Sequence, residues 1–188
     1  YKSRNLVSVR LVRELGVSRI IDIADRFGLD TAKLPRDLSI SLGTASLTPL
    51  EMAETYAIFA NGGYRVQNHL IDRIESADGE ILYQTHPVSV CRNSCEGRSV
   101  SVDLEFDNRL RPTQSDLFEL DYNDRIAPRV LDERIQFLIN DMLKDVVQQG
   151  TAKKAKALGR QDLAGKTGTT NDQVDAWFNG YQKNLVAS

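Results

Sequence analysis

Apolar residues recur every three to four positions at the start of the chain, which predicts two amphipathic helices. The first covers about residues 6–15 and stops at Gly16. The second covers about residues 17–27, with Ser18 as its N-cap and Gly28 at its end. The chain therefore opens with a helical segment.

A segment rich in serine, threonine and glycine follows at about residues 38–47, and this composition favours a strand or turn over a helix. The next helix has a strong start signal, because Thr48 can cap it, Pro49 suits its first turn and Glu51 completes a capping box. It runs to Ala60, just before an Asn-Gly-Gly sequence. Its apolar stripe is wide, so we expect this helix to be well buried.

The hydrophobic period then changes to two, which indicates strands. Residues 69–76 and 80–83 form a predicted β-hairpin, with Asp78 and Gly79 as the turn signal. Residues from about 87 to 125 are irregular and polar, and compact domains rarely contain such a loop without a reason. We expect them to form a surface excursion.

The last part of the chain predicts one more helix and a pair of strands. The helix opens at Pro128, and residues 152–158 are also compatible with a helix. The apolar face of the helix that opens at Pro128 comprises Val130, Leu131, Ile135, Phe137, Leu138, Met142, Leu143 and Val146. Residues 163–170 and 175–181 have the pattern of two adjacent strands. Helices followed by strand pairs predict an α+β fold with an antiparallel sheet flanked by helices.

Composition narrows the function classes. With 188 residues, 41% of them hydrophobic and 27% charged, the chain fits one compact globular domain. A net charge of −2 gives no general attraction to nucleic acid or to anionic lipid. No run approaches the roughly 18 apolar residues of a membrane-spanning helix. Because the chain begins with Tyr1 and lacks a signal-peptide pattern, we expect residues 1–188 to be part of a longer protein.

Two cysteines, Cys91 and Cys95, lie in the polar excursion. A zinc site would need two further ligands, and the only histidines are His69 and His86. The cysteines could form a local disulfide in an oxidising compartment, remain two loop thiols, or bind a metal. The sequence does not decide between the disulfide and the two loop thiols, and metal binding has the least support. We predict no metal site and no cofactor.

The segment most specific for chemistry is Gly165–Asn171, which contains Lys-Thr-Gly. A phosphate-binding P-loop also places Lys-Thr after a glycine, in the pattern G-x4-G-K-[ST]. Here five residues separate Gly159 from Gly165, which is one too many. A P-loop also follows a strand and opens a helix, whereas residues 152–158 are helix-like and the residues after Lys-Thr oppose a helix. This context excludes a P-loop.

The same tripeptide lies on a strand of penicillin-interacting serine enzymes, where each residue has a task. In those enzymes the lysine ammonium supplies positive potential to an anionic substrate and the threonine hydroxyl can hydrogen-bond its carboxylate, and Lys166 and Thr167 match these two positions. Gly168 lacks a side chain, so an extended ligand can lie against the strand. The backbone N–H of Thr169 can face a developing oxyanion. The alternative is an ordinary edge strand with polar residues at its end, and the tripeptide alone does not decide between them.

Ser3-Arg4-Asn5 fits the S-x-N motif of the same enzymes. A serine hydroxyl between two lysines can relay a proton to a leaving group, and the asparagine amide can orient the substrate peptide. The alternative is an N-cap role for Ser3 or Asn5 at the 6–15 helix. The motif becomes informative because it precedes Lys-Thr-Gly and a helix follows it directly.

Together these segments resemble the transpeptidase domain of bifunctional, high-molecular-weight (class A) penicillin-binding proteins, over most of residues 3–181. Residues 41–53, 59–63 and 175–181 also look like segments of that family, and the cysteine-bearing loop is similar to that of its Gram-negative 1A branch. The resemblance implies the fold shared by penicillin-binding transpeptidases and serine β-lactamases. It also implies a parent protein that cross-links peptidoglycan stem peptides ending in D-Ala-D-Ala through an acyl-enzyme, binds β-lactams, and lies at the periplasmic face of the bacterial inner membrane.

The resemblance assigns catalytic roles to Ser3, Asn5 and Lys166, and substrate-binding roles to Thr167, Gly168 and Thr169. The family's nucleophilic serine lies in an S-x-x-K motif, but no serine of this chain has a lysine three positions later. We expect that motif before Tyr1, together with a glycosyltransferase domain and a membrane anchor. We therefore predict that these 188 residues alone are inactive.

Two other functions share these motifs. A serine β-lactamase is disfavoured, because 163 residues with a long polar excursion separate Ser3 from Lys166. A non-catalytic β-lactam sensor or scaffold domain would keep both motifs, so this alternative stays open. If the motifs form one site, Ser3 Oγ and Lys166 Nζ must lie within reach of a hydrogen bond or one bridging water.

Overall fold

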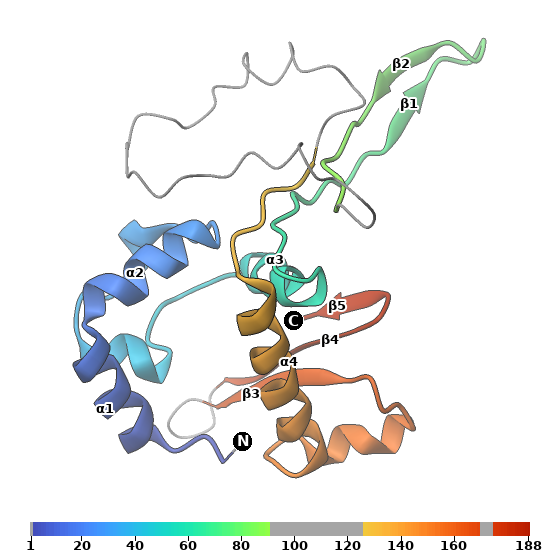
Figure 1. Ribbon diagram of the computed structural model, residues 1–188. Coiled ribbons are helices and arrows are strands. Elements are labelled where there is room, and N and C mark those ends of the chain that lie inside the picture. Colours follow the sequence, from blue (N-terminus) through green and yellow to red (C-terminus); the bar gives the residue numbers. More distant parts are fainter. Residues whose placement is uncertain (1, 91–125, 170–174) are drawn as a thin grey trace. The chain divides into compact units, whose positions relative to one another are not determined.

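A computed structural model describes residues 2–90, 126–169 and 175–188 of the chain. The chain divides into two compact units (Figure 1). The larger unit contains Tyr1–Arg65 and Arg129–Ser188, and the smaller unit contains Val66–Pro128. Each unit is described by itself below. Both candidate motifs belong to the larger unit.

The first two helices agree with the sequence pattern. Helix α1 spans Asn5–Leu15 and helix α2 spans Val17–Arg26. The predicted N-cap of α2 was wrong: Gly16 occupies that position, and no side chain caps the helix. Gly16 has a φ of 87°, a conformation that glycine adopts without the steric cost that a Cβ would bring. A left-handed glycine therefore makes the turn between the two helices.

Short 3₁₀ helices connect α2 to the next long helix. Helix η1 spans Thr31–Lys33, and η2 spans Leu38–Leu42. The expected strand or turn at 38–47 is thus partly replaced by helix, because the Asp37 side chain accepts a hydrogen bond from the backbone N–H of Ser39. Local capping by an aspartate overrides the composition here.

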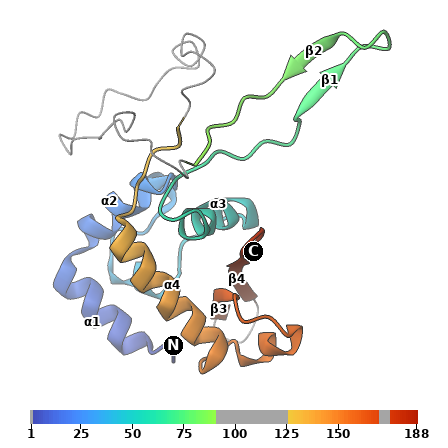
Figure 2. The same ribbon diagram turned by 45° about the vertical axis from the view of Figure 1, so that its right-hand side comes forward.

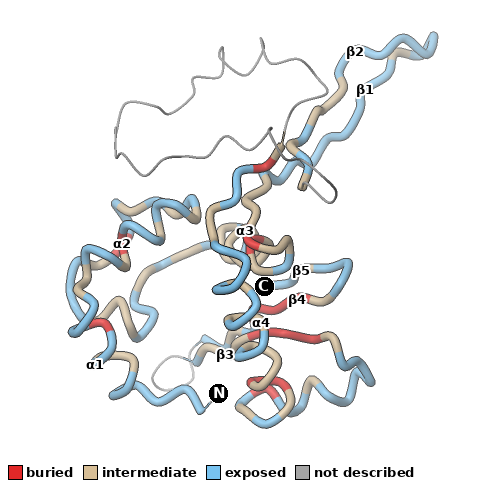
Figure 3. The backbone as a smooth tube through the Cα atoms, viewed as in Figure 1, coloured by how far each residue is buried: buried red, intermediate tan, exposed pale blue. Residues whose placement is uncertain are grey.

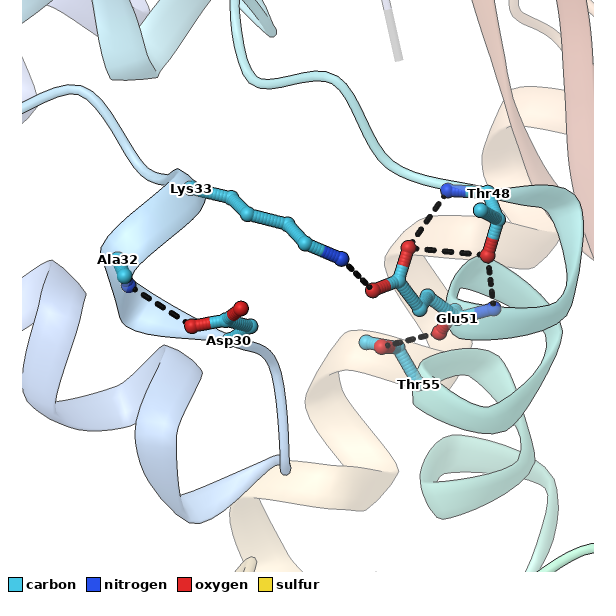
Figure 4. Close-up of polar contacts among 6 residues, drawn as sticks. All are labelled: Asp30, Ala32, Lys33, Thr48, Glu51 and Thr55. Carbon is cyan, nitrogen blue, oxygen red and sulfur yellow. Dashed lines mark hydrogen bonds and ion pairs between the residues drawn. The ribbon is translucent and has the colours of Figure 1, made fainter.

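Helix α3 spans Pro49–Ala60 and carries the predicted capping box in full. The Thr48 hydroxyl accepts from the Glu51 N–H, and the Glu51 carboxylate accepts from the Thr48 N–H at 2.7 Å. The same carboxylate binds Lys33 Nζ at 2.8 Å, as Figure 4 shows. The expectation of a well-buried helix was too strong, since Ile58 is its buried residue and Leu50 is exposed.

Helix α4 spans Glu133–Gln148, and the 3₁₀ helix η4 spans Lys153–Leu158. The prediction that this helix opens at Pro128 was wrong. Its N-cap is Asp132, whose side chain accepts from the Arg134 N–H. The predicted apolar face is also exposed at four positions, and Val146 is its buried member. These exposed residues are Ile135, Phe137, Leu138 and Met142.

A three-stranded antiparallel sheet completes the larger unit. Strand β3 spans Ala164–Thr169, β4 spans Ala176–Gln182 and β5 spans Leu185–Ala187. The order is β3-β4-β5, so β3 lies at one edge of the sheet formed by the described residues. The predicted pair 163–170 and 175–181 is confirmed, while β5 was not predicted. Helix α4 packs against β3 and helix α3 packs against β4, and Figures 1 and 2 show these elements together.

The core of the larger unit centres on the C-terminal end of α4. Val146, Val147, Ala152 and Leu163 form one buried cluster. Figure 3 shows buried segments on β3, on β4 and at this end of α4. Leu163 directly precedes β3, so the cluster fixes where that strand begins. The first strand of the candidate site is therefore anchored by packing at its N-terminal end.

The smaller unit contains the predicted hairpin. Strands β1 (Arg73–Glu75) and β2 (Ile81–Gln84) pair antiparallel, and they are shorter than the pattern suggested. Gly79 has a φ of 83° in the connecting turn, as the turn signal predicts. Most of the polar excursion expected at 87–125 lies outside the described residues, and so do Cys91 and Cys95. The disulfide, one of the alternatives for these two cysteines, is therefore not tested by the structure.

Candidate functional site

The two motifs meet in the larger unit. Lys166 Nζ donates a hydrogen bond to Ser3 Oγ at 2.8 Å, although 163 residues separate them in sequence. The distance required for a shared site is therefore met directly, without a bridging water. Lys166 comes from the middle of β3, and Ser3 comes from the segment just before α1.

Ser3 has an unusual backbone conformation. Its φ is 49°, which makes it the one non-glycine residue with positive φ among the residues that the structure describes. Such a conformation costs a residue with a Cβ about 1–2 kcal/mol. Strain of this kind gathers at functional sites, where the surrounding structure holds a side chain in a required place. The hydroxyl of this residue is the one that accepts from Lys166 Nζ.

The N-cap alternative for the S-x-N motif does not hold. Arg4 is the N-cap residue of α1, and no side-chain hydrogen bond caps this helix. Ser3 therefore precedes the cap, and Asn5 is the first helical residue. Both Ser3 and Asn5 are exposed. Their side chains are free of the local capping role that most often explains Ser and Asn near a helix start.

Lys166 lies in a partly buried position. Besides Ser3, its ammonium donates to the backbone oxygen of Thr167 at 2.7 Å. Burial lowers the pKa of Lys166 from its usual value, because removal from water disfavours the charged form. The ion pairs found among the described residues do not include Lys166. Two neutral oxygens accept from this ammonium, and no carboxylate among the described residues pairs with it.

Strand β3 contains two glycines with different surroundings. A Cβ on Gly165 would lie 2.8 Å from the backbone oxygen of Asn179 and 2.6 Å from the Phe178 ring, so packing requires glycine there. A Cβ on Gly168 would meet only Trp177 Cβ, at an ordinary 3.4 Å. The described part of the fold therefore does not require a glycine at 168. Its missing side chain leaves the strand accessible beside Lys166.

The hydroxyls of Thr167 and Thr169 differ in their contacts. Thr167 Oγ1 lies 2.5 Å from Thr151 Oγ1, a contact that the sequence motifs did not indicate. Thr169 is exposed at the end of β3, opposite Ala176. The P-loop exclusion agrees with the structure, because Lys166 and Thr167 lie within a strand and not at the start of a helix.

The chain resembles known proteins over its whole length. The family of penicillin binding protein transpeptidase domains matches residues 1–185. Penicillin-binding protein 1A of Pseudomonas aeruginosa is 41% identical over 208 residues, which cover 100% of this chain and 24% of that protein. Penicillin-binding protein 1A of Neisseria cinerea is 38% identical over 186 residues, covering 99% of this chain and 19% of that protein. The chain thus spans about a quarter or less of the length of these curated relatives.

Solved structures show the same fold. Penicillin-binding protein 1A from Haemophilus influenzae superposes with a TM-score of 0.79 at 30% identity, covering 98% of this chain and 28% of that chain. The imipenem acyl-enzyme complex of penicillin-binding protein A from M. tuberculosis gives a TM-score of 0.60 at 18% identity, covering 97% of this chain and 37% of that chain. The predicted α+β fold of penicillin-binding transpeptidases is confirmed.

Proposed function

Because this chain belongs to the family of penicillin-binding protein transpeptidase domains, we propose that it supplies the substrate-recognition and proton-relay half of a peptidoglycan D,D-transpeptidase site. The observation that carries this proposal is the 2.8 Å hydrogen bond from Lys166 Nζ to Ser3 Oγ. It joins two motifs from opposite ends of the chain. The alternative of an ordinary edge strand does not account for contact between the S-x-N and Lys-Thr-Gly motifs.

The Ser3 hydroxyl is the proposed proton relay. Because Lys166 donates to Ser3 Oγ, the Ser3 proton remains free to point at a leaving-group nitrogen. When Ser3 gives up that proton, the neighbouring ammonium stabilises the developing negative charge on oxygen. The lowered pKa of Lys166, caused by burial, favours this sharing of a proton.

Strand β3 is the proposed docking edge for the substrate. An extended peptide ending in D-Ala-D-Ala can lie along this edge beside Gly168, where the missing side chain leaves space. Thr167 and Thr169 offer hydroxyls to its carboxylate, and the Thr169 N–H faces the oxyanion. The exposed Asn5 amide, as donor and acceptor, orients the substrate peptide.

The reaction needs a nucleophile from another part of the parent protein. A serine activated by the lysine of an S-x-x-K motif attacks the D-Ala-D-Ala carbonyl, and its proton passes through Ser3 to the departing D-Ala amine. An acceptor amine then displaces the serine ester and closes the cross-link. β-Lactams acylate the same serine. No serine of the 188 residues has a lysine three positions on.

We place the parent protein at the periplasmic face of the inner membrane, anchored by a segment outside this chain, as the family resemblance implies. None of the helices in residues 2–90, 126–169 and 175–188 has the length and apolar character needed to cross a bilayer. Cysteines that form a disulfide would suit the periplasm.

The test compares full-length variants in their rate of acylation by a fluorescent penicillin and in cross-linking of a donor and acceptor peptide. Removing the Lys166 ammonium in Lys166→Ala should slow acylation about 100-fold or more, and Ser3→Ala should slow both steps similarly. Lys183→Ala, in the turn after β4, is the matched lysine control and should leave both rates unchanged.

Unchanged rates in Lys166→Ala and Ser3→Ala would refute the proposal. Acylation without any cross-linking in the unmodified protein would indicate a β-lactam sensor instead.

A further inference from the structure

The Thr167 hydroxyl has a partner that belongs to neither motif. Thr151 Oγ1 lies 2.5 Å from Thr167 Oγ1, and either oxygen can be the donor. Thr151 lies between α4 and η4, 16 residues before Thr167. It is exposed, so its position does not result from burial of its own side chain.

The backbone around Thr151 is firmly held. The Gly150 N–H donates to the carbonyls of Asp145 and Val146, and the Ala152 N–H also donates to Val146 at 3.1 Å. Ala152 belongs to the buried cluster that contains Leu163, the residue just before β3. One packed cluster therefore fixes both Thr151 and the start of the strand that carries Thr167. The core therefore sets the two backbone positions from which the hydroxyls meet.

The number of protons decides the direction of this hydrogen bond once an anion binds. A threonine hydroxyl has one proton to donate and two lone pairs that accept. If Thr167 donates its proton to a carboxylate, it can interact with Thr151 only as an acceptor. Thr151 must then be the donor, and the two hydroxyls form a chain ending at the anion. Hydrogen bonds in such a chain polarise and strengthen one another.

We propose that Thr151 is a positioning residue for carboxylate recognition, which acts by donating to Thr167 Oγ1 and so directs the Thr167 proton at the ligand. This inference rests on the proposed function, because it needs Thr167 to bind the carboxylate. Thr151 also fixes the side-chain rotamer of Thr167, since rotation about χ1 would break the contact and could turn the Thr167 methyl group towards the ligand.

The experiment uses the full-length protein and two acylating probes, a penicillin with a free carboxylate and the methyl ester of the same penicillin. The ratio of their second-order acylation rates reports carboxylate recognition alone. Thr151→Ser and Thr151→Ala form the central comparison, because they differ only in the hydroxyl. Thr167→Val, the double variant Thr151→Ala with Thr167→Val, and the control Thr55→Val complete the set. The Thr55 hydroxyl donates to the Glu51 backbone oxygen within α3.

We expect Thr151→Ala to lower the rate ratio about three- to tenfold, the effect of one hydrogen bond, while Thr151→Ser stays within about twofold of the unmodified protein. Thr167→Val should lower the ratio at least as much, and the double variant should match it, because Thr151 acts only through Thr167. Thr55→Val should leave the ratio unchanged.

Three outcomes overturn the inference in distinguishable ways. If Thr167→Val lowers the ratio but Thr151→Ala and Thr151→Ser are equal, Thr151 has no positioning role and the proposed function stands. If Thr167→Val leaves the ratio unchanged, Thr167 does not bind the carboxylate. The inference about Thr151 is then wrong, and so is the role of Thr167 in the proposed function. Equal loss of both rates in Thr151→Ala, with an unchanged ratio, shows a purely structural role and also overturns the inference.

Discussion

Lys33 and Glu51 form an ion pair at 2.8 Å that ties η1 to the first turn of α3. The Glu51 carboxylate also accepts hydrogen bonds from the N–H and the hydroxyl of Thr48, and the Glu51 backbone N–H donates to Thr48 Oγ1. One carboxylate thus closes a helix end and links two segments that are 18 residues apart. Figure 4 shows these contacts together.

The charge of Glu51 should make the free energy of unfolding depend on pH in the acid range. Hydrogen bonds from Lys33 first, and then from Thr48, lower the pKa of Glu51 from 4.5 to about 2. A carboxyl whose folded pKa is depressed stabilises the fold above its unfolded pKa, and this contribution is lost as the pH falls from about 4.5 to about 2. Glu51→Gln keeps a capping-box side chain but not the charge. Urea unfolding at several pH values should therefore show a flatter acid limb for Glu51→Gln than for Glu54→Gln, the control on the same helix.

Tyr181 should contribute to stability at neutral pH and lose that contribution in alkali. Its buried hydroxyl donates to Asn140 Oδ1 at 3.0 Å and so links β4 to α4. Tyr181→Phe leaves Asn140 without this donor, which should cost about 1–2 kcal/mol. Burial raises the pKa of Tyr181 to about 12. Stability from this group is therefore present below pH 10 and lost as the pH rises towards 12.

Urea unfolding at pH 7 and across the alkaline range tests both statements about Tyr181. Tyr83→Phe removes a hydroxyl from an exposed residue of β2 and should change the free energy of unfolding by less than about 0.5 kcal/mol. Equal stability of Tyr181→Phe and Tyr83→Phe would show that the link to Asn140 is not formed in solution.

Gly62 and Gly63 should respond very differently to alanine. Both have positive φ, 73° and 93°, so each alanine meets a backbone cost of about 1–2 kcal/mol. A Cβ on Gly62 meets nothing within 4 Å, whereas a Cβ on Gly63 would lie 2.3 Å from the Leu131 backbone oxygen. The Gly63 carbonyl also accepts from the Val130 N–H at 2.8 Å. Gly63→Ala should therefore lose at least about 2 kcal/mol more unfolding free energy than Gly62→Ala.

The 188 residues alone should form no covalent adduct with a labelled penicillin. The proposed nucleophile belongs to an S-x-x-K motif, and no serine here is followed by lysine at the third position. Intact-mass spectrometry after incubation with the label measures the adduct, and the full-length protein is the positive control. A stoichiometric adduct on this chain would locate a nucleophile within it and contradict the proposed division of the site.

Local sequence signals predicted the elements whose ends are set by neighbouring residues, such as a helix with a capping box. The capping box of Thr48 and Glu51 predicted the start of the third helix to the residue, and the pattern of two adjacent strands at 163–170 and 175–181 predicted the strand that carries Lys166. The fourth helix began five residues later than Pro128 suggested, because Asp132 supplies a cap that composition alone did not single out. Burial was harder to predict than secondary structure. Apolar residues of α4 such as Phe137 and Met142 follow the helical period but are exposed.

The candidate site could be predicted only as far as its motifs reach. The order of the motifs and the family resemblance predicted that Ser3 and Lys166 would meet, and their hydrogen bond agrees with this. Thr151 carries no signal of its own in the sequence. Its contact with Thr167 depends on how the end of α4 packs before β3, and such a relation follows from tertiary structure.

The positive φ of Ser3 costs stability, while its hydroxyl is needed for the proposed proton relay. Glycine tolerates a φ of 49° more easily than serine, so Ser3→Gly should relax the backbone while it deletes the hydroxyl that binds Lys166. Selection for thermal stability alone is expected to enrich Ser3→Gly. If Ser3 is the proton relay proposed above, a more stable variant at residue 3 is expected to transfer protons more slowly.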